Sequence, residues 1–271
     1  MQWNRVKTLL IMMLLLVNGI LGSSIAVHAI QDGILRQETA DYTIQVLKKR
    51  NIDCREAVFS QHGYRLAPGK ILLDMQEMQN FAAGFFSEDY TQKQDGEQTI
   101  FSTEEKSISF DVNGIFSGTL KEEIPLSLRA AKRQVKTWMK AQSGEYQMEG
   151  QNENNGYLIR VYRRLNGVRL EEPLQFIFLA DGTVSLSGRW TFGPLAVTDT
   201  YSDSRDTVAG SVLRFLNMAQ QIQEIDSAEA CYCMVSGNSK SLEIEPGFCW
   251  QTDQGKYLSS SASDFLLFKE E

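Results

Sequence analysis

Residues Thr8–Ile30 read TLLIMMLLLVNGILGSSIAVHAI, a run that carries no formal charge. As a helix rising about 1.5 Å per residue, the run is roughly 34 Å long, which is enough to cross a hydrocarbon core of about 30 Å. Arg5 and Lys7 precede it, and short positively charged flanks stay in the cytoplasm. We therefore expect a cytoplasmic stub at 1–7, a transmembrane anchor at Thr8–Ile30, and an extracellular remainder at 31–271.

The same run also fits a secretory signal that is removed after export. Thr8–Gly22 would be its apolar core, and the small residues Val27 and Ala29 would allow a cut after Ala29. The run is long for a signal, however, and Asp32–Arg50 continues with a helical pattern and no obvious break. These features favour a retained anchor, and the cleaved signal stays as the alternative.

Composition limits the classes of function. The chain has 271 residues, a net charge of −7 and 42% hydrophobic residues, which is ordinary for a packed globular protein. No basic stripe follows any expected element, so nucleic acid is not an expected partner.

The cysteines and histidines are too few for a disulfide scaffold or a zinc site. There are four cysteines and two histidines, and His28 lies inside the apolar run. Cys231 and Cys233 share one face of a strand and are poorly placed to bridge each other. We expect unpaired core cysteines, or a single bridge from Cys249 to one of that pair. The four cysteines are Cys54, Cys231, Cys233 and Cys249.

The pattern of turns predicts an α+β fold with largely antiparallel sheets. Ser107–Val112 alternates, Asn113-Gly114 is a tight turn, and Ile115–Leu120 returns, which is typical of a hairpin. Helices are expected over Ile34–Asn51, Met75–Phe86, Pro125–Gln142 and Asp206–Gln221; Pro125 and Ser127 open the third, and Ser204 caps the fourth. The third and fourth helices are expected to bury apolar stripes, namely Leu128, Ala131, Val135 and Trp138 on the third, and Val208, Val212, Phe215, Ala219 and Ile222 on the fourth. Further strands are expected at Ile71–Leu73, Tyr157–Arg164, Val168–Leu170, Leu174–Leu179, Thr183–Trp190, Ala228–Val235, Leu242–Glu245, Phe248–Thr252 and Tyr257–Ser260.

The extracellular part is expected to form two related α+β units, each with helices packed on antiparallel strands. A helix followed by two or three such strands recurs along the chain. We place the first unit at 31–122 and the second at 123–271. The polar stretch Gly144–Asn155 is an alternative boundary, and Gln92–Gln98 is expected to be a loop.

Catalytic motifs are absent from the sequence. His62 is the sole histidine outside the apolar run, and no Gly-x-Ser-x-Gly elbow, paired-histidine metal motif or phosphate-binding glycine loop occurs. Adjacent carboxylates on a strand point to opposite faces and are expected to be solvated rather than convergent. These pairs are Glu104-Glu105, Glu122-Glu123 and Glu171-Glu172. The aromatic residues Trp138, Phe215, Trp190, Phe192, Phe248 and Trp250 are expected in the core, although the last four also suit a groove.

The amino terminus resembles that of the YycI-type regulatory proteins of Gram-positive two-component systems. The matching features are Trp3, Lys7-Thr8 and an aliphatic run ending in Asn18. The segment Val46–Ile52 is similar to the start of the extracellular part of YycI and of its relative YycH. Pro246, Trp250 and Gly255–Leu258 resemble the closing strands of that family.

The resemblance implies a single-pass, non-enzymatic regulator that binds a sensor histidine kinase controlling cell-wall metabolism, together with a YycH-like partner subunit. It places the contacts largely on the membrane helix and implies no cofactor, metal or small-molecule substrate. The partner-binding positions to expect are Trp3, Lys7, Thr8, Asn18, Gly19 and Gly22. Two alternatives stay open: a secreted inhibitor or peptide-binding module, and a cell-wall enzyme whose acidic side chains converge in one cleft.

Overall fold

The structure is a computed structural model of the whole chain. It describes residues 2–59, 62–86, 89–141, 144–197, 201–218, 222–238, 240–260 and 266–270. The chain divides into two compact units, Met1–Cys54 and Arg55–Glu271. The class is α+β, with a long apolar helix followed by a large domain of antiparallel strands, as expected from the sequence.

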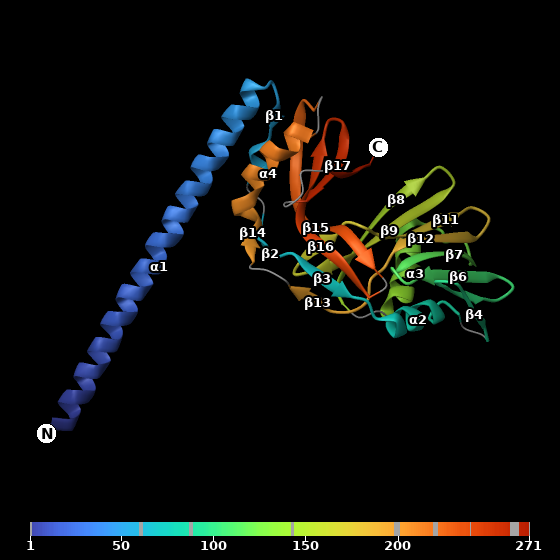
Figure 1. Cartoon of the computed structure of the whole chain (residues 1–271), viewed down its shortest axis with the longest axis horizontal. Coiled ribbons are helices and arrows are strands. Elements are labelled where there is room, and N and C mark those ends of the chain that lie inside the picture. Colours follow the sequence, from blue (N-terminus) through green and yellow to red (C-terminus); the bar gives the residue numbers. More distant parts are fainter. Residues whose placement is uncertain are drawn as a thin grey trace. The chain divides into compact units, whose positions relative to one another are not determined.

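The first unit is dominated by one uninterrupted helix, α1 (Gln2–Lys49), the blue rod in Figure 1. The anchor and the helix expected after it are therefore one element. It ends where Asn51 takes a left-handed backbone conformation (φ 58°), which asparagine tolerates better than most residues. The Ile52 amide then donates to the Leu47 carbonyl at 3.0 Å and satisfies one carbonyl of the last turn.

The second unit is built on a long, mostly antiparallel sheet. Its strands follow the order β13-β3-β16-β15-β10-β9-β11-β12-β7-β6-β5-β4, with β8 beside β9 and β17 between β16 and β18. The pair β10–β15 is parallel. The strands on this path are β3 (Gly69–Leu72), β4 (Thr91–Asp95), β5 (Gln98–Ser102), β6 (Lys106–Asp111), β7 (Ile115–Lys121), β9 (Gly156–Leu165), β10 (Val168–Leu170), β11 (Leu174–Leu179), β12 (Thr183–Arg189), β13 (Leu195–Val197), β15 (Glu224–Asn238) and β16 (Ser241–Thr252).

The remaining elements are short or flank this path. They are β1 (Asp53–Cys54), the 3-10 turn Glu56–Val58, β2 (Arg65–Leu66), α2 (Met75–Ala83), α3 (Leu128–Trp138), the 3-10 turn Met139–Ala141, β8 (Tyr146–Glu153), β14 (Ser202–Asp203), α4 (Ser204–Met218), β17 (Gly255–Ser260) and β18 (Leu266–Glu270). The strands β2 and β14 pair with each other.

Helices α2 and α3 cover one face of the sheet and enclose the larger core with strands β5 to β7, β9, β11 and β12 (Figure 1). Asp74 begins α2 by accepting the amides of Gln76 and Glu77 at 3.0 Å, and Ser127 begins α3 by accepting the Ala130 amide at 3.2 Å. Each cap pairs amides that the first helical turn leaves without a partner. The apolar stripe expected on α3 packs against this core through Leu128, Ala131, Val135 and Trp138.

Helix α4 packs at the other end of the sheet. Phe215 is fully buried and stacks on Trp250 of β16, with ring centroids 4.9 Å apart and planes at 8°. Val208 and Val212 are buried on the same helix, as expected. The helix α4 is therefore held mainly by its apolar stripe, because helices in proteins gain most of their stability from packing.

Three local expectations are wrong. The stretch Gln92–Gln98 is not a loop but holds most of β4 and the start of β5. The polar stretch Gly144–Asn155, which also contains β8, stays a prediction as the alternative boundary. The two strands expected on either side of Pro246 form one strand, β16. The expected helix end at Phe86 lies beyond α2, which stops at Ala83.

The start of α4 also differs from the expectation. Ser204 is its first residue, and its hydroxyl accepts the Tyr64 amide at 3.0 Å instead of capping the helix. Asp203 takes that place by accepting the Arg205 amide at 2.9 Å. The expected ends of α3 at Gln142 and of α4 at Gln221, and with the latter Ala219, lie outside the described residues.

The division of the extracellular part into two units, expected between residues 122 and 123, stays a prediction. Strand β7 lies before it and β12 after it, and the two are hydrogen-bonded neighbours from Ile115↔Arg189 to Thr183↔Lys121. The larger core likewise includes side chains from both sides, such as Phe116 and Phe176.

Candidate functional site

Helix α1 presents apolar side chains on all of its faces. Between Val6 and Ile30 its large apolar residues are from 50% exposed, at Val17, to 69% exposed, at Ile25. A helix that is hydrophobic all round needs a nonpolar environment. Over Val6–Lys49 the helix is long and apolar enough to cross a membrane.

The helix brings five of the six expected partner-binding positions to one side. At about 100° of rotation per residue, these five fall within an arc of roughly 120°, a third of the circumference. They are Lys7, Thr8, Asn18, Gly19 and Gly22. Trp3 lies on the same helix, but its side chain lies outside the described part of the chain.

Small and polar residues within this arc suit contact with a second helix. A side-chain carbon added to Gly19 or Gly22 would meet nothing within 4 Å, so both positions are open to a partner. Small residues let two helix backbones approach closely, and an asparagine can hydrogen-bond across the interface. By contrast, the Ser23 hydroxyl is used within the helix, where it donates to the Ile20 carbonyl at 2.8 Å.

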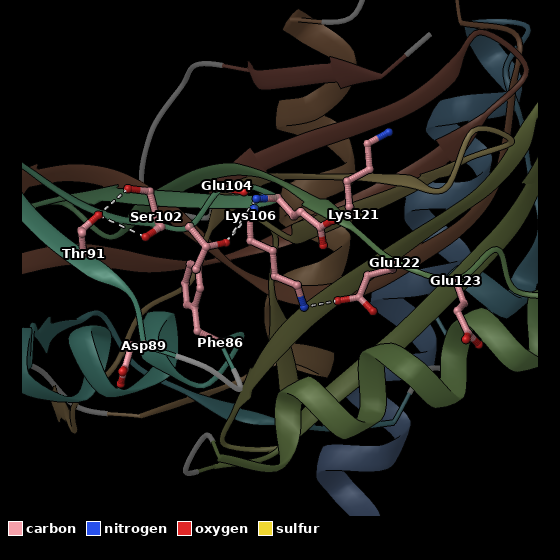
Figure 2. Close-up of a pocket in the computed structure, with 11 residues that line it drawn as sticks. Phe86, Asp89, Thr91, Ser102, Glu104, Lys106, Lys121, Glu122 and Glu123 are labelled. Carbon is pink, nitrogen blue, oxygen red and sulfur yellow. Dashed lines mark hydrogen bonds and ion pairs between the residues drawn. The ribbon is translucent and has the colours of Figure 1, made fainter.

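A second candidate site is a depression of about 1100 Å³ in the second unit, shown in Figure 2. It lies beside the edge strand β4 and the β5–β6 and β7–α3 connections. Its lining carries five acidic and two basic side chains. The lining residues are Phe86, Asp89, Thr91, Ser102, Thr103, Glu104, Glu105, Lys106, Lys121, Glu122 and Glu123.

One acidic group in this depression, the Glu122 carboxylate, is already paired. Lys106 and Glu122 point toward each other in Figure 2, and Lys106 Nζ lies 2.6 Å from Glu122 Oε1. Gln134 donates to the other carboxylate oxygen at 3.2 Å. Lys121 instead donates to the Thr183 hydroxyl at 3.0 Å. The two oxygens of Glu122 thus bind one side chain from β6 and one from α3. This links both elements to the β7–α3 connection.

The expectation for the adjacent carboxylate pairs is partly wrong. Glu104-Glu105 and Glu122-Glu123 border the same depression, because the β5–β6 and β7–α3 connections lie next to each other. Glu171 is also not solvated, since its side chain is only 4% exposed. The alternation of side chains along one strand holds, but it does not describe residues in turns.

The histidine and cysteine expectations can be compared directly with the structure. His62 is exposed. No disulfide joins any of the four cysteines, all of which lie in the described residues, and Sγ of Cys231 and Cys233 are 3.9 Å apart on β15. Cys249 packs in the same small cluster with Leu258. Burial, followed by the Glu171 charge, raises the pKa of Cys249 to about 11, so this thiol is not a ready nucleophile. Among the described residues, no group of acidic, histidine and cysteine side chains is arranged to hold a metal ion.

The six aromatic residues belong to the core. Trp190, Phe192, Phe248 and Trp250 are each at most 3% exposed and do not line an open groove. Trp138 stacks on Phe178 with planes at 7°. The preference for core packing over a groove is therefore confirmed.

No protein-family model and no curated protein sequence matches this chain. Two solved structures are similar in part. One is the crystal structure of an uncharacterized protein from Eubacterium rectale ATCC 33656, with 8% identity over 76% of this chain and 87% of that chain and a TM-score of 0.48. The other is the Bacillus megaterium YpeB C-terminal domain, with 11% identity over 74% of this chain and 98% of that chain and a TM-score of 0.36.

Proposed function

We propose that this protein is a single-pass membrane protein that binds and modulates a sensor histidine kinase of a two-component system controlling cell-wall metabolism. In this proposal it is not an enzyme, its amino terminus is cytoplasmic and its second unit is extracellular. A YycH-like subunit is the proposed companion. The observation that supports the proposal most is that five of the expected positions, Lys7, Thr8, Asn18, Gly19 and Gly22, share one side of the exposed helix α1.

A retained anchor is supported by the continuity of α1. The expected cleavage position after Ala29 lies in the interior of a helix that continues to Lys49. A peptidase must bind its substrate as an extended chain, so cleavage there would require several turns of this helix to unfold. The alternative is a secreted inhibitor or peptide-binding module whose mature chain begins near Ile30.

An anchor has two physical consequences for regulation. It confines the chain to the same bilayer as its partner, which raises the effective concentration of each for the other. It also allows the helix to favour one kinase state, but only if it contacts two kinase states differently. Asn18 is the position best suited to such a difference, since a hydrogen bond across two membrane helices is made or lost with a change in their packing.

The test replaces single positions of α1 and measures kinase output in cells. Gly22→Leu places a bulky side chain inside the arc, and we expect it to abolish co-purification with the kinase and the response of its target genes. Ser24→Leu is the matched control, since two residues further along the helix it faces the opposite side. Equal effects of the two substitutions would refute the proposed contact face.

Two further measurements separate the alternatives. The intact mass of the exported protein distinguishes a full chain in membranes from a mature chain that begins near Ile30. The third alternative is a cell-wall enzyme whose acidic side chains converge in one cleft. The acidic depression is the observation that favours this alternative. Hydrolysis of cell-wall polymer by the purified full chain, lost in Glu104→Gln, would support that enzyme over the regulator.

A further inference from the structure

A smaller cavity, of about 400 Å³, lies where strands β9 to β12 approach β15 and β17 within the second unit. Its volume is in the range of small-molecule sites, which are mostly apolar with a few fixed polar groups. Its lining comes from five strands and the β10–β11 connection, so it exists only in the folded domain. The lining residues are Tyr162, Glu171, Glu172, Pro173, Gln175, Gly188, Arg189, Met234, Lys256, Tyr257 and Leu258.

One side of the cavity carries a group of paired charges. The buried Glu171 carboxylate pairs with Arg169 Nε and lies 3.2 Å from Lys256 Nζ. Both cations also lie over the Tyr162 ring, with Arg169 Cζ at 5.1 Å and Lys256 Nζ at 5.7 Å from its centroid. Burial lowers the pKa of Lys256, but the Glu171 charge outweighs this and raises it overall, so Lys256 stays cationic.

Another side is formed by a guanidinium whose donors are only partly used. The Arg189 side chain is 17% exposed, and its Nη1 pairs with Glu172 at 2.9 Å and contacts Met234 Sδ. Its Nε is buried and has no hydrogen-bond partner among the described residues. Buried donors of this kind are normally satisfied. Glu172 lies nearer the surface, at 42% exposed, and can turn toward water.

The geometry points to a binding site for a small monocarboxylate with an apolar or aromatic body. A carboxylate is the group that best matches the two parallel donors of a guanidinium edge, and it would take the Arg189 edge that carries the unpaired Nε, beside Glu172 at Nη1. The body of the ligand would contact the apolar part of the lining, namely Pro173, Met234 and Leu258. The ligand could be a free acid or the carboxyl terminus of a peptide, since both present the same group.

The test measures dissociation constants for the full chain in lipid nanodiscs by ligand-observed NMR, with empty nanodiscs subtracted. The probes are 3-phenylpropionate, the alcohol 3-phenyl-1-propanol, and the dipeptide acetyl-Ala-Phe with a free or an amidated carboxyl terminus. We expect a carboxylate to bind at least about tenfold more tightly than its uncharged counterpart, because a charge-assisted bidentate pair is about twice as strong as a neutral one. Binding of the propionate identifies a free acid, and binding of the unamidated dipeptide alone identifies a peptide terminus.

Three variants locate the binding. Arg189→Lys keeps the charge but loses the planar fork, and it should remove the preference for the carboxylate. Glu172→Gln removes the competing carboxylate and should tighten binding severalfold, a gain that impaired folding would not produce. Arg129→Lys, at an exposed position on α3, is the matched control and should bind as the wild type does. Equal affinity for acid and alcohol, or weaker acid binding in Glu172→Gln, would overturn the site.

Discussion

The charge cluster around Glu171 should dominate the stability of the second unit. Its carboxylate is 4% exposed and pairs with Arg169 and Lys256, which link β10 to β17. Glu171→Gln would leave Arg169 and Lys256 without the negative charge that both of them pair with. Arg169 would keep Glu149 at 2.8 Å and Glu229 at 3.3 Å, but these carboxylates are 42% and 64% exposed and are screened by water.

The size of the effect follows from the burial of Glu171. Removing one partner of a buried ion pair costs about 3–5 kcal/mol, because an uncompensated charge stays in the interior. For a domain of this size each kcal/mol corresponds to about 2–4 °C, so Tm should fall by roughly 6–20 °C. Lys256 is 22% exposed and can reach water in part, which places the expectation at the lower end of that range.

The assay is thermal and denaturant unfolding of the full chain in detergent, followed by near-ultraviolet circular dichroism. Glu229→Gln is the matched control, since that side chain is 64% exposed and Arg169 would keep Glu171, so its loss should change stability by less than about 1 kcal/mol. If the free energies of unfolding of the two variants differ by less than about 1 kcal/mol, the Glu171 carboxylate does not stabilise this cluster, and the reasoning is wrong.

Four further results are expected from unfolding and labelling measurements. Gly247→Ala should destabilise by about 1–3 kcal/mol, because the added carbon would lie 2.3 Å from a β17 carbonyl oxygen and 2.5 Å from Cys233 Sγ. Gly210→Ala in α4, with nothing within 4 Å, should be neutral or stabilise by up to about 1 kcal/mol. Cys249, whose pKa burial raises to about 11, should be alkylated by iodoacetamide at pH 7.4 only as fast as the domain opens, and faster labelling in mass spectra of the native protein would contradict its burial. Burial also raises the pKa of Glu172, against the opposing effect of the neighbouring guanidinium, so the folded form binds that proton more tightly than the unfolded form. As pH falls from 7 through 4.5, the wild type should therefore gain stability relative to Glu172→Gln, and a loss in unfolding titrations would refute the assigned sign.

Local sequence signals predicted much of the domain because they act over a few residues. The Asn166-Gly167 turn has positive φ at both residues, 50° and 85°, as a two-residue hairpin turn requires. Ser127 is the observed cap of α3, and its apolar stripe faces the core. The apolar run of α1 could be recognised without any tertiary contact. Its length and composition alone mark it as a helix long enough to cross a membrane.

Strands β4 and β8 were missed because they lack the signal that identifies a strand. All five residues of β4 are exposed, so no alternation of apolar and polar residues marks it. It exists because β5 supplies its hydrogen bonds, as the pairing Lys93↔Ile100 shows. The opposite error occurred at Pro246, where β16 continues because Pro246 and Gly247 keep their places opposite β15.

The candidate sites also differ in whether the sequence alone could predict them. The long apolar helix and the arc of its expected positions could be predicted from the sequence, since residues on one helix have a fixed angular relation. The carboxylate cavity could not be predicted, because Tyr162, Arg189 and Lys256 are distant in the chain and meet only when β10 pairs with β15. Sequence alone therefore determined the long apolar helix, the fold class and most local elements, which depend on short-range backbone preference and apolar periodicity. Only the tertiary structure decided which charges are buried together, since that depends on the order in which distant strands pair.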